Sequence, residues 1–282
     1  MGKGADVEKD MLDYLQIPPM ERIVFEHTPL VLAICQIRFK PVLSISDPTY
    51  VAAFQRALVD HYPILDPFGE VKVRMEGLPT QVQVEQGTPA HRWKFTDPDD
   101  TWTIVLALDF ISLETRAYAD FDEFSTRLHE ALSALRRSFP QAVGTRIGLR
   151  YINEIRTADH GWDDAIRPAL QGSLAEPEFS EHVDQAIQQV VLKFEGNQGI
   201  NVRHGLLEGT AVQPRPGEDP PTSRFYLLDY DAYREYPRPG SLLLDPEVIG
   251  EQVGILHEAI SRLFRWSITK EYTSSLGIRH ND

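Results

Sequence analysis

The chain contains a single cysteine, Cys35, among its 282 residues, and this scarcity restricts the chemistry open to it. One thiol forms no internal disulfide and builds no cysteine-based zinc cage. Cys35 lies in the middle of an apolar run, whereas a nucleophilic cysteine needs an exposed and electropositive setting. We therefore predict that this thiol is buried and unreactive.

Long apolar runs are also missing from the sequence. No segment approaches the ~18 consecutive apolar residues that indicate a membrane-spanning helix. Residues 1–21 lack the apolar core of a secretory signal. We expect a soluble, cytoplasmic protein that does not act at a membrane.

Positive charge is scarce, since 42 acidic residues outnumber 28 lysines and arginines and give a net charge of −14. Proteins that bind nucleic acid carry clustered Lys and Arg side chains, which displace counterions from phosphates. Here the basic residues are scattered along the chain. The composition argues against nucleic acid as the main partner, and the acidity suits either solubility or a partner with a basic surface.

Signatures of catalysis and of cofactor binding are absent from the sequence. There is no GxSxG nucleophile elbow, no GxxxxGK[ST] phosphate loop and no GxGxxG turn after a strand. None of the nine histidines has the spacing of a metal-ligand pair. The sequence thus predicts no catalytic residue, no metal and no cofactor, and it leaves open whether any reaction is catalysed.

Hydrophobic periodicity predicts a mixed α+β fold. Residues 31–39 are largely apolar, which indicates a strand buried on both faces, and Asp47 before Pro48 predicts the start of a helix that ends near residue 62. Alternation of period two then predicts an antiparallel meander with strands at 71–76, 81–86, 91–97 and 101–118, the last as one bent strand or two. A long helix is expected at 121–139. The second half is expected to hold a strand at 144–157, a short helix at 162–170, a hairpin at 186–207, a loop at 210–222, a strand at 224–230 and a long helix at 246–269.

A helical segment is written twice in the chain, as LHEALSALRRSF at Leu128–Phe139 and as LHEAISRLFRWS at Leu256–Ser267. Two strand motifs also recur: Ile37-Arg38-Phe39 matches Leu149-Arg150-Tyr151, and Leu108-Asp109-Phe110 matches Leu228-Asp229-Tyr230. These matches predict an internal duplication, with two tandem β-α-β-meander-α units at 25–140 and 141–282 after a flexible N-terminal arm at 1–24. Each unit would place a long helix across an antiparallel sheet, in a TATA-binding-protein-like or helix-grip-like arrangement.

Three segments carry a family resemblance: FEHTPLVLAICQIRF near the N-terminus, RIGLRYINEI in the middle, and the LLD strand before the C-terminal helix. The chain resembles, over residues 20–278, a sporadically distributed family of bacterial proteins of uncharacterised function. The most specific element of the resemblance is LRYIN at Leu149–Asn153. The resemblance brings no activity, cofactor or catalytic residue, and the patchy distribution of the family suggests accessory roles such as those of defence islands or mobile operons.

The best-supported polar set consists of one arginine and one aspartate from each half, which are Arg38, Asp109, Arg150 and Asp229. Two interpretations stay open. Either each Arg pairs with an Asp as a structural ion pair, in which case Asp109→Ala should destabilise the protein, or the four line a groove that binds a carboxylate or phosphate. Two further polar residues continue the second strand: Glu154 shares a face with Arg150, and Asn153 lies on the opposite face, where it needs a buried partner.

Two other groups of residues are candidate sites. His129 and His257 occupy the same place in the repeated helix, and neither has a second ligand at helical spacing, so helix capping or surface packing is expected for both. Three tyrosines flank a Pro-rich segment and suit either a partner-binding surface or ordinary packing at a strand end; they are Tyr230, Tyr233 and Tyr236.

The sequence favours a non-catalytic binding or adaptor protein that acts with a protein partner, as an accessory or defence-related factor of a small operon. The alternative is a small-molecule sensor or enzyme with a pocket between the sheet and its long helices, lined by Arg38, Arg150 and nearby acids. A homodimer is compatible with either function.

Overall fold

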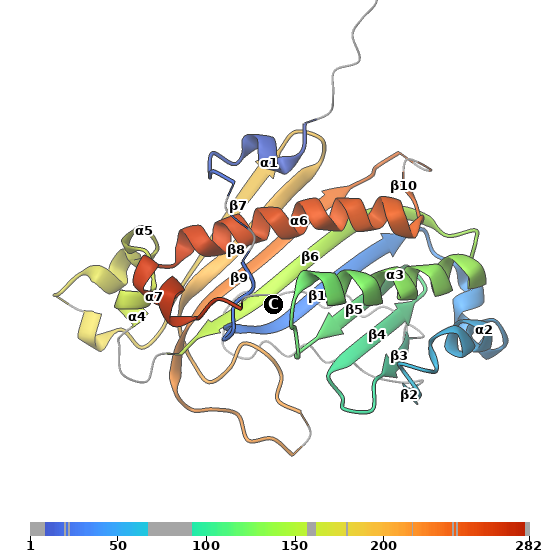
Figure 1. Cartoon of the computed structure of the whole chain (residues 1–282), viewed down its shortest axis with the longest axis horizontal. Coiled ribbons are helices and arrows are strands. Elements are labelled where there is room, and N and C mark those ends of the chain that lie inside the picture. Colours follow the sequence, from blue (N-terminus) through green and yellow to red (C-terminus); the bar gives the residue numbers. More distant parts are fainter. Residues whose placement is uncertain are drawn as a thin grey trace, which may run out of the picture.

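The computed structural model of the chain describes residues 9–19, 21, 23–66, 92–156, 162–178, 180–215, 217–238, 240 and 242–279. Within these residues the chain forms an α+β fold with one large antiparallel sheet and several helices (Figure 1). The strands expected at 71–76 and 81–86 lie outside the described residues. No helix of the described ranges is both long enough and apolar enough to cross a lipid bilayer.

The sheet has ten strands in the order β2-β3-β4-β5-β1-β6-β9-β8-β7, and β10 pairs with β6 beside this path. The strands are β1 (Leu30–Phe39), β2 (Ile64–Asp66), β3 (Arg92–Thr96), β4 (Trp102–Ala107), β5 (Phe110–Thr115), β6 (Val143–Ile155), β7 (Ala186–Phe194), β8 (Gln198–Glu208), β9 (Arg224–Glu235) and β10 (Leu242–Leu243). The run expected at 101–118 thus forms two strands, and the hairpin expected at 186–207 is formed by β7 and β8. At the centre, β1 of the first half pairs with β6 of the second.

Two long helices, α3 (Phe121–Ser138) and α6 (Pro246–Ser267), lie across the same face of the sheet (Figure 1). An aspartate caps the N-terminus of each helix, because its carboxylate accepts a hydrogen bond from a backbone N–H of the first turn. The distance is 2.9 Å for Asp120 and 3.1 Å for Asp245. The structure therefore confirms both long helices that the sequence predicts.

The other helices are short: α1 (Met11–Tyr14), α2 (Pro48–Leu58), α4 (Trp162–Ala165), α5 (Pro168–Gln171), α7 (Lys270–Ser275) and the 3₁₀ helices η1 (Leu43–Ser46), η2 (Gly172–Ala175) and η3 (Ser180–His182). Asp47 caps α2 as predicted, by accepting from Thr49 N at 2.8 Å. The short helix expected at 162–170 is divided between α4 and α5. Within the N-terminal arm, α1 contacts α6, and the side chain of Met11 is buried.

The core lies between the sheet and the helices. In β1 the side chains of Ala33, Cys35 and Ile37 are buried toward the helices, whereas Arg38 is exposed on the other side. The expectation that this strand is buried on both faces is therefore wrong, because the helices cover one face and successive side chains alternate between faces. The prediction that Cys35 is buried is confirmed, and burial raises the pKa of its thiol to about 12, which disfavours the nucleophilic thiolate.

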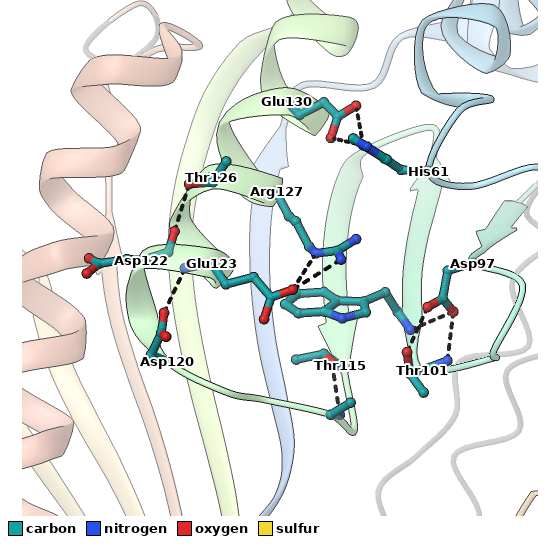
Figure 2. A network of polar contacts seen from close by, with 12 residues as sticks. His61, Asp97, Thr101, Thr115, Asp120, Asp122, Glu123, Thr126, Arg127 and Glu130 are labelled. Atoms are coloured by element: carbon teal, nitrogen blue, oxygen red, sulfur yellow. Dashed lines mark hydrogen bonds and ion pairs between the residues drawn. The ribbon is translucent and has the colours of Figure 1, made fainter. Parts of the chain in front are cut away.

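Figure 2 shows polar contacts within α3 and within the turn between β3 and β4. The guanidinium of Arg127 lies 4.5 Å from the centre of the Trp102 ring and donates to Glu123, one turn earlier, at 3.1 Å. Asp97 accepts hydrogen bonds at 2.7–2.9 Å from Thr101 and from the backbone of Trp102, which fixes the turn between β3 and β4. Of these contacts, the one between Arg127 and Trp102 joins α3 to β4.

The sheet face away from α3 and α6 is called here the outer face, and it carries the side chains of Arg38, Arg150, Glu154 and Asp229. Val212, which follows β8, packs on part of it against a small apolar cluster built around Ile152, Phe225 and Leu227. The sheet thus has a helix-covered face and an outer face with separate chemistry.

Candidate functional site

A pocket of about 110 Å³ lies on the helix-covered face of the sheet, between the start of α3 and the middle of α6. Residues 24–27 pair with residues 276–279 beside it, through hydrogen bonds of 2.9 Å from His27 N to Leu276 O and from Arg279 N to Val24 O. The lining is mainly apolar or aromatic, and it includes Ile23, Val24, Phe25, Leu30, Phe121, Ile260 and Phe264. The polar atoms of the lining come from β6, α6 and the segment before α3.

Three aromatic residues form the polar floor of the pocket. The hydroxyl of Tyr151 lies 3.0 Å from Nδ1 of His257 and 3.3 Å from the hydroxyl of Tyr118. Phe121 stacks on His257, with ring centres 4.1 Å apart and planes 6° from parallel. Burial, followed by the neighbouring Tyr118, raises the pKa of Tyr151 well above its ordinary value, so its hydroxyl is neutral and serves as a hydrogen-bonding group.

Asn153 lies two residues further along β6, on the same face as Tyr151. Its side chain is 5% exposed, and its amide nitrogen donates to the carbonyl of Leu228 at 3.0 Å. Within the described residues the amide oxygen accepts no hydrogen bond, although Asn153 lines the pocket. The buried partner that the sequence required is thus the backbone of β9, and an acceptor is left for a bound molecule.

The face of α6 that lines the pocket carries His257, Ser261 and Arg265, which are spaced four residues apart and so lie on one side of the helix. Arg265 donates from Nη1 to the carbonyl of Glu21 at 2.6 Å, and among the described residues it forms no ion pair. Partial burial lowers the pKa of the Arg265 guanidinium below its ordinary value. Its neighbour Glu258 pairs instead with Arg262, at 2.7 Å.

Arg150 and Asp229 form a two-pronged ion pair on the outer face. Nε and Nη2 of Arg150 donate to the two carboxylate oxygens of Asp229 at 2.8 and 2.7 Å, and Arg203 lies 3.7 Å from the same carboxylate. Burial alone would lower the pKa of Arg150, but the hydrogen bonds and charge of Asp229 raise that pKa above its ordinary value. This pair has the geometry of the structural ion pair that the sequence offered as one interpretation.

The matching pair does not form in the first half. Arg38 is exposed and donates to Gln36 at 3.2 Å, and the described residues include no carboxylate that pairs with it. Asp109 lies in the β4–β5 turn, where its carbonyl accepts from Phe39 N, whereas Asp229 lies in the middle of β9. The expectation of one Arg–Asp pair in each half is therefore wrong, because the two aspartates occupy different places in their hairpins.

The pocket between the sheet and the helices is not lined by Arg38 and Arg150, contrary to the expectation. Neighbouring residues of a strand point to opposite faces, so Tyr151 reaches α6 while Arg150 reaches the outer face. Glu154 also lies on the outer face, where it accepts hydrogen bonds at 2.6 Å from Thr210 and from the backbone of Ala211. Its role there is to hold Thr210 and Ala211, which follow β8.

The tyrosines expected at a partner surface are separated in the structure. Tyr230 is fully buried and donates to Ser267 at 2.7 Å, so the expectation that it belongs to an exposed partner surface is wrong. Tyr236 donates to Gln252 of α6 at 3.3 Å. Tyr233 lies on the outer face, 5.0 Å from the guanidinium of Arg146. Packing within the protein thus accounts for Tyr230, in the middle of β9, and for Tyr236, just after its end.

Sequence reasoning expected His257 to cap a helix or pack at the surface, and it did not consider Tyr118, Ser261 and Arg265, although all four line the pocket. The repeat equivalent of His257, His129, is half-exposed on α3 and lies 3.8 Å from Glu247, as expected of a surface residue. The repeat also matches Ser133 and Arg137 to the other two pocket residues of α6, so the motif alone does not distinguish a pocket face from a solvent face. The four-residue spacing of His257, Ser261 and Arg265 is no signal either, because the same three residue types recur at the same spacing on the exposed side of α3.

The described part of the chain contains no cluster of three or more His, Cys, Asp or Glu side chains that is arranged to hold a metal ion. In comparisons with known proteins, no protein-family model and no curated protein matches the chain.

Removal of the Asp229 carboxylate should destabilise the protein, because Arg150 and Arg203 would lose a nearly buried partner. We expect Asp229→Ala to lower the free energy of unfolding by about 2 kcal/mol. The matched control is Asp109→Ala, which should stay within about 0.5 kcal/mol of the wild type, since this side chain pairs with no described residue. Urea unfolding followed by circular dichroism measures both changes, and equal effects would refute the assignment of the ion pair to the second half.

Proposed function

We propose that this protein is a non-catalytic binding protein that holds a small molecule in the pocket between α3 and α6. The observation that carries the proposal is the composition of the pocket, since ligand sites combine an apolar, aromatic wall with a few fixed polar groups. Tyr118, Tyr151 and His257 supply hydrogen-bonding atoms, and their mutual contacts hold them in place. The neutral hydroxyl of Tyr151 suits recognition better than nucleophilic attack.

A ligand in this pocket contacts both long helices at once. The start of α3 supplies Asp120 and Phe121, and α6 supplies His257 and Ser261. A bound molecule therefore favours one relative position of the two helices, by as much as its affinity differs between positions. This coupling supports a sensor function.

Small aromatic probes test the pocket. Benzene, phenol and benzamide, added in a thermal-shift assay, should raise the melting temperature, because a ligand at about 100 times its Kd stabilises by about 2.7 kcal/mol. The variant Ser261→Phe fills the pocket and should abolish the shift. The repeat-equivalent variant Ser133→Phe on α3 should keep it.

A shift that persists in Ser261→Phe would place the binding elsewhere and contradict the proposal. The same conclusion would follow if neither these probes nor the carboxylates benzoate and isobutyrate raised the melting temperature of the wild-type protein.

A second function, action with a protein partner, is favoured by β7 at the end of the sheet. Val190 and Val191 are 44% and 48% exposed, and the described residues contribute no strand beyond β7. Residues Ala186–Phe194 include no acidic residue, although the chain carries a net charge of −14. An exposed, regular edge strand of this kind accepts an extended segment of a partner protein through main-chain hydrogen bonds. We propose that β7 is where such a partner pairs.

Site-specific crosslinking in the native host tests this surface. A photoreactive residue at Val190 should give one stoichiometric crosslinked protein, whereas the same residue at the equally exposed Val248 of α6 should give none. A crosslink to a second copy of the chain would show a homodimer instead of a separate partner. Absence of a crosslink at Val190, or the same products at Val248, would contradict pairing at β7.

We propose further that the chain arose by tandem duplication, with the units and boundaries predicted from the sequence. The strand order supports this, because β5-β1 and β6-β9 are mirrored about the centre of the sheet. The register supports it too: Gln36 lies opposite Gly148, and a two-fold rotation about this pair carries Arg38 onto Arg150, as the sequence match requires. A single sheet with two long helices on one face suits the TATA-binding-protein-like arrangement better than the helix grip.

We keep the bacterial family of uncharacterised function, the accessory or defence-related role and the cytoplasmic location as proposals that rest on the sequence alone. The LRYIN motif of that family contributes Tyr151 and Asn153 to the pocket, which makes the pocket the place to look for the activity of the family.

A further inference from the structure

We propose that the pocket selects small carboxylic acids and that Arg265 binds their carboxylate group. The inference rests on the proposed ligand-binding function and specifies the chemistry of the ligand. It depends on the relation of Arg265 to the other polar groups of the lining.

Arg265 is the arginine among the described residues of the pocket lining, and within these residues it forms no ion pair. Its hydrogen bond goes to a backbone carbonyl, that of Glu21, and no described carboxylate is paired with it. A guanidinium has five N–H donors in a rigid fork, so donors are left over that match the two oxygens of a carboxylate. Because the group is half-buried in a mainly apolar lining, an incoming anion gains more there than at an exposed arginine.

The acidic residues of the lining are committed to other partners. Asp120 caps α3 by accepting from Glu123 N at 2.9 Å. Glu258 accepts from Nε of Arg262 at 2.7 Å, one turn further along α6. Neither carboxylate forms an ion pair with Arg265 within the described residues, although Glu258 and Glu21 both contribute to its electrostatic surroundings. A ligand carboxylate therefore competes with a carbonyl group for Arg265, and not with an established ion pair.

The groups around Arg265 fix the orientation of the ligand. Ser261 lies one helical turn from Arg265 on the same side of α6, and its hydroxyl provides a second donor to a carboxylate. The opposite part of the pocket holds the rings of Phe121 and Tyr151, which suit an apolar or aromatic body. The volume of about 110 Å³ restricts that body to a branched chain of a few carbons or a single ring.

Paired acids and amides test the inference by isothermal titration calorimetry. Benzoate and isobutyrate should bind the wild-type protein at least tenfold more tightly than benzamide and isobutyramide, which have the same shape without the charge. Arg265→Gln should remove this preference and leave the weak binding of the amides. The matched control is Arg137→Gln, the repeat-equivalent arginine on the exposed side of α3, which should keep the wild-type preference.

The outcomes separate this inference from the proposed function. If amides bind as tightly as acids, or if Arg265→Gln keeps the preference, the carboxylate assignment is refuted while ligand binding in the pocket stands. If neither acids nor amides bind the wild-type protein, the proposed function falls with it. A circular-dichroism melting curve of each variant shows that a lost preference does not reflect unfolding.

Discussion

The pairing of β1 with β6 is the interaction on which the rest of the structure depends. It joins the strands of the first half to those of the second, so that a single sheet runs from β2 to β7. It also decides which side chains face the helices: Cys35 lies opposite Leu149, and Ala33 opposite Tyr151, all on the covered face. A shift of this register by one residue would move Tyr151 to the outer face and dismantle the pocket.

Alternation along β6 separates two kinds of chemistry within neighbouring residues. Arg150 and Glu154 lie on the outer face, where both make ion pairs and Glu154 also binds Thr210 and Ala211. Tyr151 and Asn153 lie on the covered face, where they reach His257 and the backbone of β9. The most specific motif of the sequence, LRYIN, is thus divided between the two faces: Arg150 belongs to an ion pair on the outer face, and Tyr151 and Asn153 line the pocket.

Local features of the structure could be predicted from the sequence because they depend on neighbouring residues. Asp47, Asp120 and Asp245 cap helices as their positions indicate, and alternating apolar residues correctly mark β3, β4 and β5. The site could be predicted only in part, since its residues come together through tertiary packing. Sequence matching placed Asp109 and Asp229 in equivalent positions, but one lies in a turn and the other in mid-strand.

His129 and His257 also show that tertiary packing could not be predicted from the sequence. They occupy identical places in LHEA, and only the packing of the segment at Phe121 against α6 makes His257 part of the pocket. Aromatic residues near a Pro-rich segment likewise suggested an exposed surface, yet Tyr230 points into the core and binds Ser267. Periodicity reports which side of an element is apolar, but it does not report which other element covers that side.

The most direct test of the pocket as the binding site is a long-range ¹H–¹⁵N correlation spectrum of the histidine side chains, recorded during titration with benzoate. Benzoate in the pocket should shift the ring nitrogens of His257, which contact Tyr151 and Phe121, and leave those of His129 unchanged. Unchanged His257 resonances at saturating benzoate, or equal shifts at both histidines, would contradict the pocket as the site.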